Sequence, residues 1–508
     1  MTTVDGSATA YGILPGAMTP ARFTAAVLTH DPGRLLVTAA TLGPAEDPYL
    51  DDHGDEAALV FPTACALEAL AQAWCAITGH DGPPVIEAVE FGEPLVVPRN
   101  RAVEVRLVAV AGPEPTTARV TLRSTRPGYR VDHVRARLRH RGTGAAPDGE
   151  PDARLPAGGG LVASAPRDEP PLLPTHPARE VYDGLVRRGP RLRRLLSYHE
   201  ITAAGCVAEL AGAEAAWWFQ AAPPEPLVLG DPGLRDAYLH ALQPWAPDAA
   251  LLPLGVDRIW VAGTGPYEQV TLHAVRRDRN RDVHRFDLEV RSRGRVVERW
   301  TGLRLRLVPG DRPPGPWPAH VLGPYLRRRL TQLVGFDGTV VLEPGLHRDR
   351  RRQHTALAVS RLLGPGAAVR YRPDGRPEVG GGWWVSAAHG SASTLAVAAR
   401  TPVGCDIEPV VWRDRAEWHG LLGGHLALAD LVAAETGEPL STSATRVWSA
   451  LESLHKVGVT AVTPLTLGRH TPDRWVLLSA GGWQAATCVA GLRGGPEELA
   501  VAVVSRAG

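Results

Sequence analysis

The sequence predicts an α+β protein in which a helix-and-strand unit occurs twice and a third mixed unit follows. A long apolar helix is expected at 63–77 and a second at 232–243. Each helix precedes three segments with the two-residue alternation of strands; these are 103–111, 118–124 and 131–140, and then 268–275, 283–291 and 296–308. Because the same order of elements recurs, we expect each unit to wrap antiparallel strands around one helix. With 508 residues, the chain should hold two to four domains.

Local signals place the ends of both helices. Pro62 precedes the first helix and Gly79 follows it, as proline often does at helix starts and glycine at helix ends. The apolar side of this helix carries Leu67, Leu70, Ala71 and Trp74. Asp231 and Pro232 are the expected cap and first residue of the second helix. A further strand is expected at 34–40 and another at 207–210.

Two stretches without periodicity divide the chain. Residues 142–177 are rich in Gly, Pro, Ala and Asp, and residues 309–319 are rich in proline, so both are expected to be linkers. The predicted units are therefore residues 1–141, 178–308 and 320–508.

Composition narrows the class of protein. The net charge of +1 offers no electrostatic reason to expect a nucleic acid or an anionic membrane as partner. Five cysteines without C-x-x-C spacing favour reduced thiols over a disulfide framework. No basic segment followed by an apolar run opens the sequence, and no stretch approaches the length of a membrane span. We expect a cytoplasmic protein.

The third unit contains an acidic cluster with one lysine. Asp406 and Glu408 are two residues apart after a predicted strand at 393–399, so their side chains share a face. Glu452 and Lys456 are four apart on a predicted helix and also share a face. Three carboxylates and an ammonium suit Mg²⁺ that also binds phosphate oxygens. Lys456 is the only lysine in the chain, although an ion pair on a helix surface would explain its pairing with Glu452 equally simply.

These residues resemble the Sfp-type 4′-phosphopantetheinyl transferases. That family carries G-x-D-x-E, complete here at 404–408, and W-x-x-K-E-x-x-x-K, complete at 448–456 except that Leu451 replaces the first lysine. The family's G-[KR]-P element is matched at 375–377. Where F-N-x-S-H-S is expected, only His389 is kept in full. The resemblance implies an α+β domain of pseudo-twofold symmetry that moves phosphopantetheine from coenzyme A to a serine of a carrier protein.

The resemblance also implies a role for each matched residue. The Mg²⁺ ligands would be Asp406, Glu408 and Glu452; Glu452 could instead deprotonate the serine, and Lys456 would neutralise the pyrophosphate or protonate the leaving oxygen. Coenzyme A contacts would come from His389 and from the turn formed by Gly375, Arg376 and Pro377. The 3′-phosphate would be held by Arg361, or by Arg351 or Arg352, although a solvated basic helix face explains this arginine run as well.

The first two units carry a second set of motif residues. His53 lies nine residues before Pro62, and Asp236 and His240 share a helix face. They resemble the H-x-x-x-G-x-x-x-x-P and D-x-x-x-[QH] motifs of polyketide synthase dehydratases, whose fold is a double hotdog. Ala57 replaces the motif glycine. The stretches 234–247 and 252–259 look like those of enediyne-type synthases, in which a dehydratase often precedes a phosphopantetheinyl transferase.

Dehydration of a 3-hydroxyacyl thioester needs a base and an acid. His53 suits the base that removes the proton beside the carbonyl. Asp236 suits the acid if burial raises its pKa, with His240 as an orienting group. Backbone N–H groups at the start of the first helix could stabilise the thioester oxygen.

The sequence therefore predicts a bifunctional enzyme that modifies an acyl carrier protein and dehydrates acyl chains bound to it. Two alternatives stay open for the front half. It could be a non-catalytic hotdog module that docks the carrier or dimerises the protein, or a hotdog thioesterase. A homodimer is likewise left open.

Overall fold

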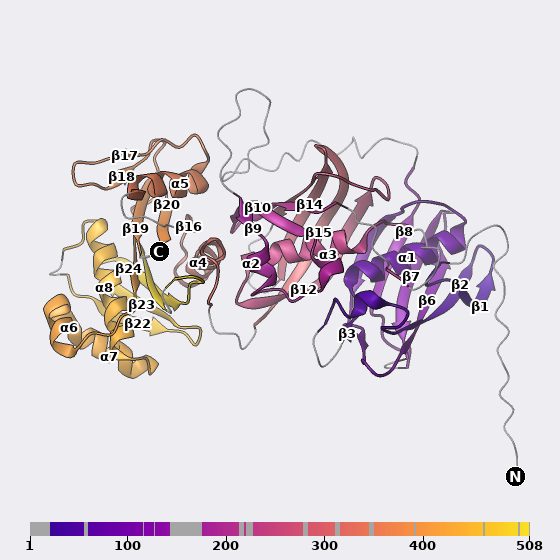
Figure 1. The fold of residues 1–508 in the computed structure, drawn as a ribbon, viewed down its shortest axis with the longest axis horizontal. Helices are drawn as coiled ribbons and strands as arrows, with labels where there is room; N and C mark the ends of the chain where they lie inside the picture. The colour runs from indigo at the N-terminus through magenta and orange to yellow at the C-terminus, as the bar shows by residue number, and fades with distance from the viewer. Residues whose placement is uncertain are drawn as a thin grey trace, which may run out of the picture.

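The computed structural model describes residues 21–506 apart from short gaps, which are 55–58, 115, 126–127, 143–174, 213–217, 220–226, 278–282, 310–314, 345–349, 391–392, 461–462 and 496–497. Within this part, the chain forms an elongated arrangement in which two sheet-and-helix halves adjoin and a C-terminal domain packs at one end (Figure 1). No helix in the described ranges is long and apolar enough to cross a membrane.

One antiparallel sheet of thirteen strands builds both front halves. Its first half comprises, in spatial order, β1 (Ala26–Asp31), β2 (Leu35–Leu42), β6 (Val103–Ala111), β7 (Thr117–Ser124), β8 (Val134–Arg139) and β4 (Val85–Phe91). Its second half comprises β12 (Ala249–Val261), β15 (Arg295–Pro309), β14 (Val283–Ser292), β13 (Val270–Arg276), β11 (Gly205–Leu210), β10 (Leu195–Thr202) and β9 (His176–Pro177). The predicted strands are confirmed within a few residues, whereas β1, β4, β9, β10 and β12 were not predicted.

The pairing of β4 with β12 joins the two halves. Val256 lies opposite Val89, and Ile259 lies opposite Ile86, so buried apolar side chains cross the seam. Burial of such side chains is the main favourable contribution to a joint of this kind. The two halves therefore form one continuous double hotdog, as the resemblance implied.

One long helix packs on each half of the sheet, and the two helices contact each other. Helix α1 (Thr63–Thr78) has Pro62 at its N-cap and ends at Gly79, whose φ of 72° is the left-handed conformation that glycine adopts without strain. Helix α3 (Pro232–Leu242) is capped by Asp231, whose side chain accepts a hydrogen bond of 2.8 Å from the Gly233 N–H. Both predicted helices are confirmed.

Short elements complete the front halves: η1 (Pro48–Leu50), β3 (Leu59–Val60), β5 (Val96–Val97), α2 (Arg179–Tyr182), η2 (Pro190–Leu192) and η3 (Gln243–Trp245). Strand β9 falls within the stretch predicted as a linker. It pairs with β10 at the edge of the sheet, so the second half begins before residue 178.

The C-terminal domain has two sheets that pack on helices. The three-stranded sheet contains β16 (Gly338–Pro344), β20 (Ser393–Ala399) and β19 (Trp384–His389), with α4 (Ala319–Val334) and α5 (Arg351–Leu363) against it. The five-stranded sheet contains β21 (Gly404–Pro409), β25 (Leu499–Arg506), β24 (Trp483–Ala490), β23 (Trp475–Ala480) and β22 (Thr466–His470), with α8 (Leu440–Lys456) against it. The remaining elements are β17 (Arg370–Tyr371), β18 (Pro377–Glu378), α6 (Arg415–Leu422), η5 (Gly423–His425) and α7 (Leu426–Thr436).

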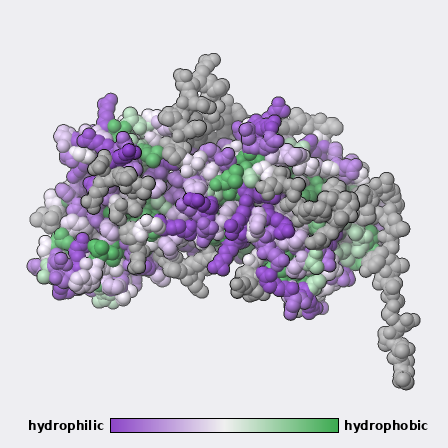
Figure 2. All heavy atoms as spheres, viewed as in Figure 1, coloured by the Kyte–Doolittle hydropathy of each residue, from purple (hydrophilic) through white to green (hydrophobic). Residues whose placement is uncertain are grey.

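The second hotdog and the C-terminal domain are in direct contact. Arg328 of α4 forms an ion pair with Asp248, and Arg493 donates to the Glu180 carbonyl at 3.1 Å. One buried apolar cluster runs from both hotdogs into this domain. The outer face in Figure 2 is mostly hydrophilic, with small and separate hydrophobic patches, as expected when the large apolar surfaces are buried.

Candidate functional site

His53 lies in the turn after η1, where two contacts set its ring. Its Nδ1 lies 2.8 Å from the Val60 carbonyl oxygen, and its Nε2 lies 3.9 Å from Asp236 Oδ1. Because a carbonyl oxygen only accepts hydrogen bonds, Nδ1 must carry the proton. In the neutral ring, Nε2 is therefore the basic nitrogen, and it faces Asp236.

Helix α3 brings Asp236 and His240 together one turn apart. His240 Nε2 lies 2.8 Å from Asp236 Oδ2, and both side chains are buried. A buried network holds this helix on β15: Glu298 accepts from Arg235 at 2.9 and 3.0 Å, and from Tyr238 at 3.2 Å. The predicted pairing of Asp236 with His240 is confirmed, and His53 joins it from the other hotdog.

The protonation state of Asp236 differs from the one that the sequence predicts, whereas His53 is neutral as a base requires. Burial lowers the pKa of His53 to about 4, and Arg188 and His240 act in the same direction, so the ring is neutral near pH 7. Burial acts to raise the pKa of Asp236, but His240, His53 and Arg188 outweigh it, and the pKa lies well below the usual range. The prediction that burial keeps Asp236 protonated is therefore wrong for the free protein, because three neighbours stabilise the carboxylate.

Arg188 is a residue of this site that the motifs did not identify. Its Nε lies 3.4 Å from Asp236 Oδ2. The adjacent Gly189 fixes its position, since the Gly189 N–H donates to the Asp52 carbonyl at 2.9 Å. A Cβ on Gly189 would lie 2.8 Å from the Asp52 Cα, so only glycine allows this approach. The sequence signal was the arginine immediately before Gly189 and Pro190.

A cavity of about 240 Å³ opens onto the three residues. Its wall is mostly apolar and comes from both hotdogs, with Phe61, Phe91, Leu95, Leu122, Val134, Val186, Leu239, Leu251 and Leu252 among its residues. Thr63, at the first turn of α1, also lines it. Ala57, the departure from the glycine motif, lies outside the described residues.

The C-terminal domain holds the second candidate site, where α8 packs closely on β21. A Cβ on Gly404 would lie 2.1 Å from the Ser453 carbonyl oxygen, which explains the glycine that precedes Asp406. Lys456 Nζ donates to the Cys405 carbonyl at 2.7 Å and lies 3.0 Å from Asp406 Oδ1. The only lysine of the chain therefore links α8 to β21. Its ion-pair partner is Asp406, whereas the spacing in the sequence suggested Glu452.

The other two carboxylates lie in the same electrostatic field. Burial raises the pKa of Glu408, with Asp406 and Glu452 adding to the increase and Lys456 opposing it. Leu451, where the family has lysine, instead packs with an apolar cluster around α8 that includes Trp418 and Leu454.

The sequence predicts that Asp406, Glu408 and Glu452 bind Mg²⁺, and the structure shows how far these carboxylates suit the ion. Among the described residues, no group of three His, Cys, Asp or Glu side chains is arranged to hold a metal ion. However, the second carboxylate oxygen of Asp406 is buried and has no hydrogen-bond partner within the described part of the chain. An unsatisfied carboxylate oxygen, with Glu408 and Glu452 in the same electrostatic field, is the kind of oxygen ligand that Mg²⁺ prefers.

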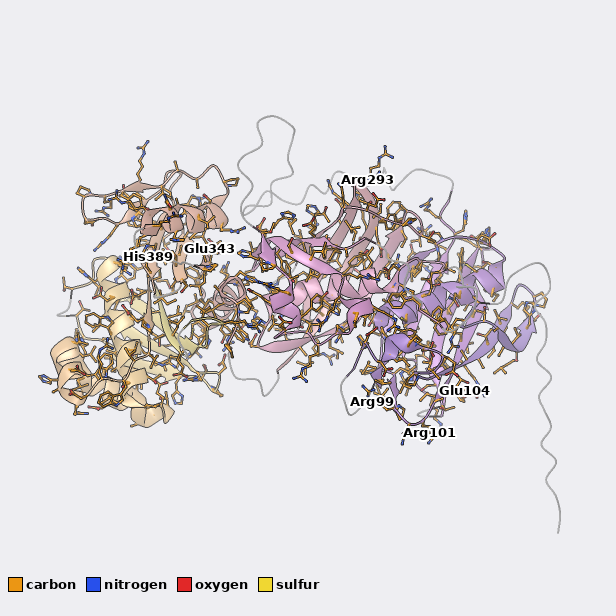
Figure 3. The ribbon with its side chains drawn as sticks, in the orientation of Figure 1. Arg99, Arg101, Glu104, Arg293, Glu343 and His389 are labelled. Atoms are coloured by element: carbon orange, nitrogen blue, oxygen red, sulfur yellow. The ribbon has the colours of Figure 1, made fainter. Side chains whose placement is uncertain are left out.

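His389 is the last residue of β19 (Figure 3). Its Nε2 lies 3.2 Å from Thr355 Oγ1 and its Nδ1 lies 2.9 Å from Thr394 Oγ1. Burial lowers the pKa of His389 to about 4, and the charges of Arg351, His354 and Lys456 lower it further. His389 therefore lies within the electrostatic influence of Arg351, at the start of α5, and of Lys456.

The turn between β17 and β18 also reaches this cluster. Gly375 has a φ of 83°, and Arg376 donates to the carbonyl oxygens of Lys456 at 2.9 Å and His455 at 3.2 Å. Pro377 begins β18. The predicted turn is thus anchored to the end of α8.

Arg361 is the one candidate that lies elsewhere. Its Nε is 3.1 Å from Glu343 Oε1, and its Nη1 donates to the His199 carbonyl of the second hotdog at 2.9 Å. This buried guanidinium joins two domains and is already paired, which argues against Arg361 as the phosphate ligand and leaves Arg351 and Arg352 as the candidates. Helical spacing could not show this, because the second hotdog that packs against α5 is distant in sequence.

Two family models match the front of the chain. Residues 24–125 match the model described as Polyketide synthase dehydratase domain. Residues 161–315 match the model described as Polyketide synthase dehydratase N-terminal domain. The first match contains His53, and the second contains Arg188, Asp236 and His240.

Among the solved structures that match are two dehydratase domains. That from the CurF module of curacin polyketide synthase is 18% identical, with a TM-score of 0.41, and covers 54% of this chain and 94% of its own. That of a mycocerosic acid synthase-like polyketide synthase is 19% identical, with a TM-score of 0.42, and covers 59% and 98%. No curated protein matches the chain.

Proposed function

We propose, from the premise that the front of this chain consists of polyketide synthase dehydratase domains, that it removes water from 3-hydroxyacyl thioesters carried by an acyl carrier protein. The observation that carries this proposal is the neutral His53, whose Nε2 faces Asp236 across a mostly apolar cavity. A buried neutral imidazole is a competent base for a weakly acidic C–H group.

The proton path follows from the charge states. His53 Nε2 takes the proton from the carbon beside the thioester carbonyl. The resulting imidazolium passes this proton to the Asp236 carboxylate, which is 3.9 Å away and is ionised beforehand. Asp236 then protonates the 3-hydroxyl, the carbon–oxygen bond breaks, and water and the 2,3-unsaturated thioester are the products. Backbone N–H groups at the start of α1, where Thr63 lines the cavity, would stabilise the thioester oxygen.

The wild-type protein tests this proposal against both alternatives. Incubation with a 3-hydroxyacyl carrier protein should reduce its mass by one water, and His53→Ala should abolish the change. His30→Ala, on β1 and away from the cavity lining, is the matched control and should retain activity. Release of free acid would indicate a thioesterase, and an unchanged substrate would indicate a docking or dimerisation module.

For the C-terminal domain we propose transfer of 4′-phosphopantetheine from coenzyme A to a carrier-protein serine. The observation that favours it is the Asp406–Lys456 pair, with Glu408 and Glu452 in its field and His389 beside it. Such a step depends mainly on positioning and charge neutralisation.

Each residue then has a task in the transfer. Glu452 would accept the serine proton, and the serine oxygen would attack the phosphoryl group that carries the pantetheine arm. The pyrophosphate bond breaks, 3′,5′-ADP leaves, and Lys456 neutralises the departing oxygen. Arg351 and His389 would hold the coenzyme A phosphates, and Arg376 would hold its turn against α8. Bound Mg²⁺, on Asp406 and Glu408, would supply charge neutralisation of the pyrophosphate. If another group accepts the serine proton, Glu452 would be the third ligand.

Intact mass spectrometry of an apo carrier protein tests the transfer. With wild-type protein, coenzyme A and Mg²⁺, the carrier should gain the mass of one arm, and Asp406→Ala should prevent the gain. Asp430→Ala, an exposed carboxylate on α7, is the control that should leave transfer unchanged. A carrier that gains no mass with the wild-type protein would exclude the proposal. The enediyne-type pathway and a cytoplasmic location remain predictions of the sequence.

A further inference from the structure

A further cavity lies between the second hotdog and the C-terminal domain, away from both proposed sites. Its volume is about 700 Å³, within the range of small-molecule sites. The hotdog contributes β9, β10 and Arg276 of β13 to its wall. The other domain contributes α4, β16 and the end of α5, together with Trp383 and Arg400.

The wall is rich in arginines, of which Arg277 is paired with Asp287 and Arg328 with Asp248. It contains six arginines and three carboxylates; the arginines are Arg276, Arg277, Arg327, Arg328, Arg361 and Arg400. Of the carboxylates, Glu343 is paired with Arg361, and Asp337 extends into solvent with its side chain 90% exposed. Burial raises the pKa of Glu200 to about 7, so this third carboxylate is substantially protonated near neutral pH.

Several of these arginines lie on aromatic rings. The Arg400 guanidinium lies 3.8 Å from the centre of the Trp383 ring, and that of Arg276 lies 5.0 Å from Trp245. Arg400 also donates from Nη1 to the Gly381 carbonyl oxygen. Guanidinium N–H groups are the donors that bind phosphate oxygens in pairs. Arg276 and Arg400 belong to different domains, so one ligand could engage both.

Two residues of the wall also carry buried nitrogen atoms that have no hydrogen-bond partner among the described residues. His320 is 6% exposed, and its Nε2 has no hydrogen-bond partner among the described residues. Nε of Arg328, which is also 6% exposed, likewise has no hydrogen-bond partner in the described ranges. Such groups are uncommon in folded proteins unless a ligand or ordered water satisfies them.

We propose that this cavity binds a small phosphorylated molecule, with its phosphate oxygens held by arginines of both domains. The proposal does not depend on either enzymatic activity. A bound molecule would contact the second hotdog and the C-terminal domain together and would stabilise their contact.

Calorimetric titration of the full chain tests the site. Inorganic pyrophosphate and 3′,5′-ADP are titrated separately with EDTA present, so that no divalent cation contributes at the transferase site. We expect binding of one molecule per chain and an increase in the thermal unfolding midpoint. Binding of pyrophosphate shows that the phosphate group is sufficient, whereas binding of 3′,5′-ADP alone identifies a nucleotide ligand; both support the proposal.

Variants decide where the ligand binds. Arg400→Gln and Arg276→Gln should each weaken binding about tenfold, because each removes a charge-assisted hydrogen-bond donor. Arg400 is exposed, so its replacement alone is sufficient should Arg276→Gln impair folding. Arg293→Gln, at the exposed turn between β14 and β15 (Figure 3), is the matched control and should bind normally. Absence of binding by both probes, or binding that Arg351→Gln weakens and Arg400→Gln does not, would overturn the proposal.

Discussion

Dehydration by this protein should persist at unusually low pH, because its base titrates far below an ordinary histidine. Burial, Arg188 and His240 place the pKa of His53 at about 4 instead of 6.5. The reaction needs the neutral ring, so kcat/KM should be constant above about pH 5 and decrease as the pH falls through 4. At pH 5 about nine tenths of the sites would hold a neutral ring, against about 3% for an unperturbed histidine, a difference of about thirtyfold.

The substitution Arg188→Gln tests whether the surroundings of His53 set this pH dependence. Removing this cation removes one of the influences that lower the pKa of His53, so the acid limb of the rate profile should move to higher pH. The rate of base catalysis above the limb should change little, because His53 is neutral there in both proteins.

The assay is kcat/KM for a 3-hydroxyacyl thioester between about pH 3 and pH 8, with circular dichroism at each pH to show that the fold persists. The control is Arg187→Gln, the neighbour of Arg188 that does not line the cavity. A wild-type acid limb near pH 6.5, or a limb that Arg188→Gln leaves in place, would refute the reasoning.

Three further perturbations test how the sites are held. Glu298→Ala should lower the free energy of unfolding by about 3–5 kcal/mol, measured in denaturant, because it leaves buried Arg235 without its partner; Glu289→Ala, whose partners are more exposed, should cost far less. Gly189→Ala should destabilise by about 1–3 kcal/mol and reduce dehydration in the mass assay, since its Cβ would collide with Asp52; equal activity would argue against this contact. Lys456→Arg should lower phosphopantetheine transfer at least tenfold, because a guanidinium cannot reproduce the compact contacts of Nζ with the Cys405 carbonyl and Asp406; full transfer would show that any cation suffices.

The close packing of the second hotdog and the C-terminal domain has a consequence for both proposed reactions. Arg328, Arg361 and Arg493 each cross from the C-terminal domain to the hotdog, and the apolar core continues between them. The two candidate sites are therefore carried on one assembly. A carrier protein that receives its arm at one site has to reach the other by its own movement or by exchange.

Local signals were sufficient for much of the fold. The start and end of α1 follow from Pro62 and Gly79, and the cap of α3 follows from Asp231, because these residues act on their own backbone. The spacing of Asp236 and His240 places both on one turn whatever the helix packs against. Side chains two residues apart on a strand likewise share a face, so β21 places Asp406 and Glu408 on one side whatever it pairs with.

Contacts between distant segments decided the rest. Pairing of β4 with β12 makes one sheet of two repeats, and no local pattern encodes which strand edges meet. Tertiary packing brings Arg188 to Asp236 and keeps that carboxylate ionised, whereas burial by itself predicted the opposite. It also directs Arg361 to Glu343 and away from the proposed coenzyme A site. Backbone conformation depends on near neighbours in sequence, but charge state depends on every group nearby in space, so only the folded structure determines it.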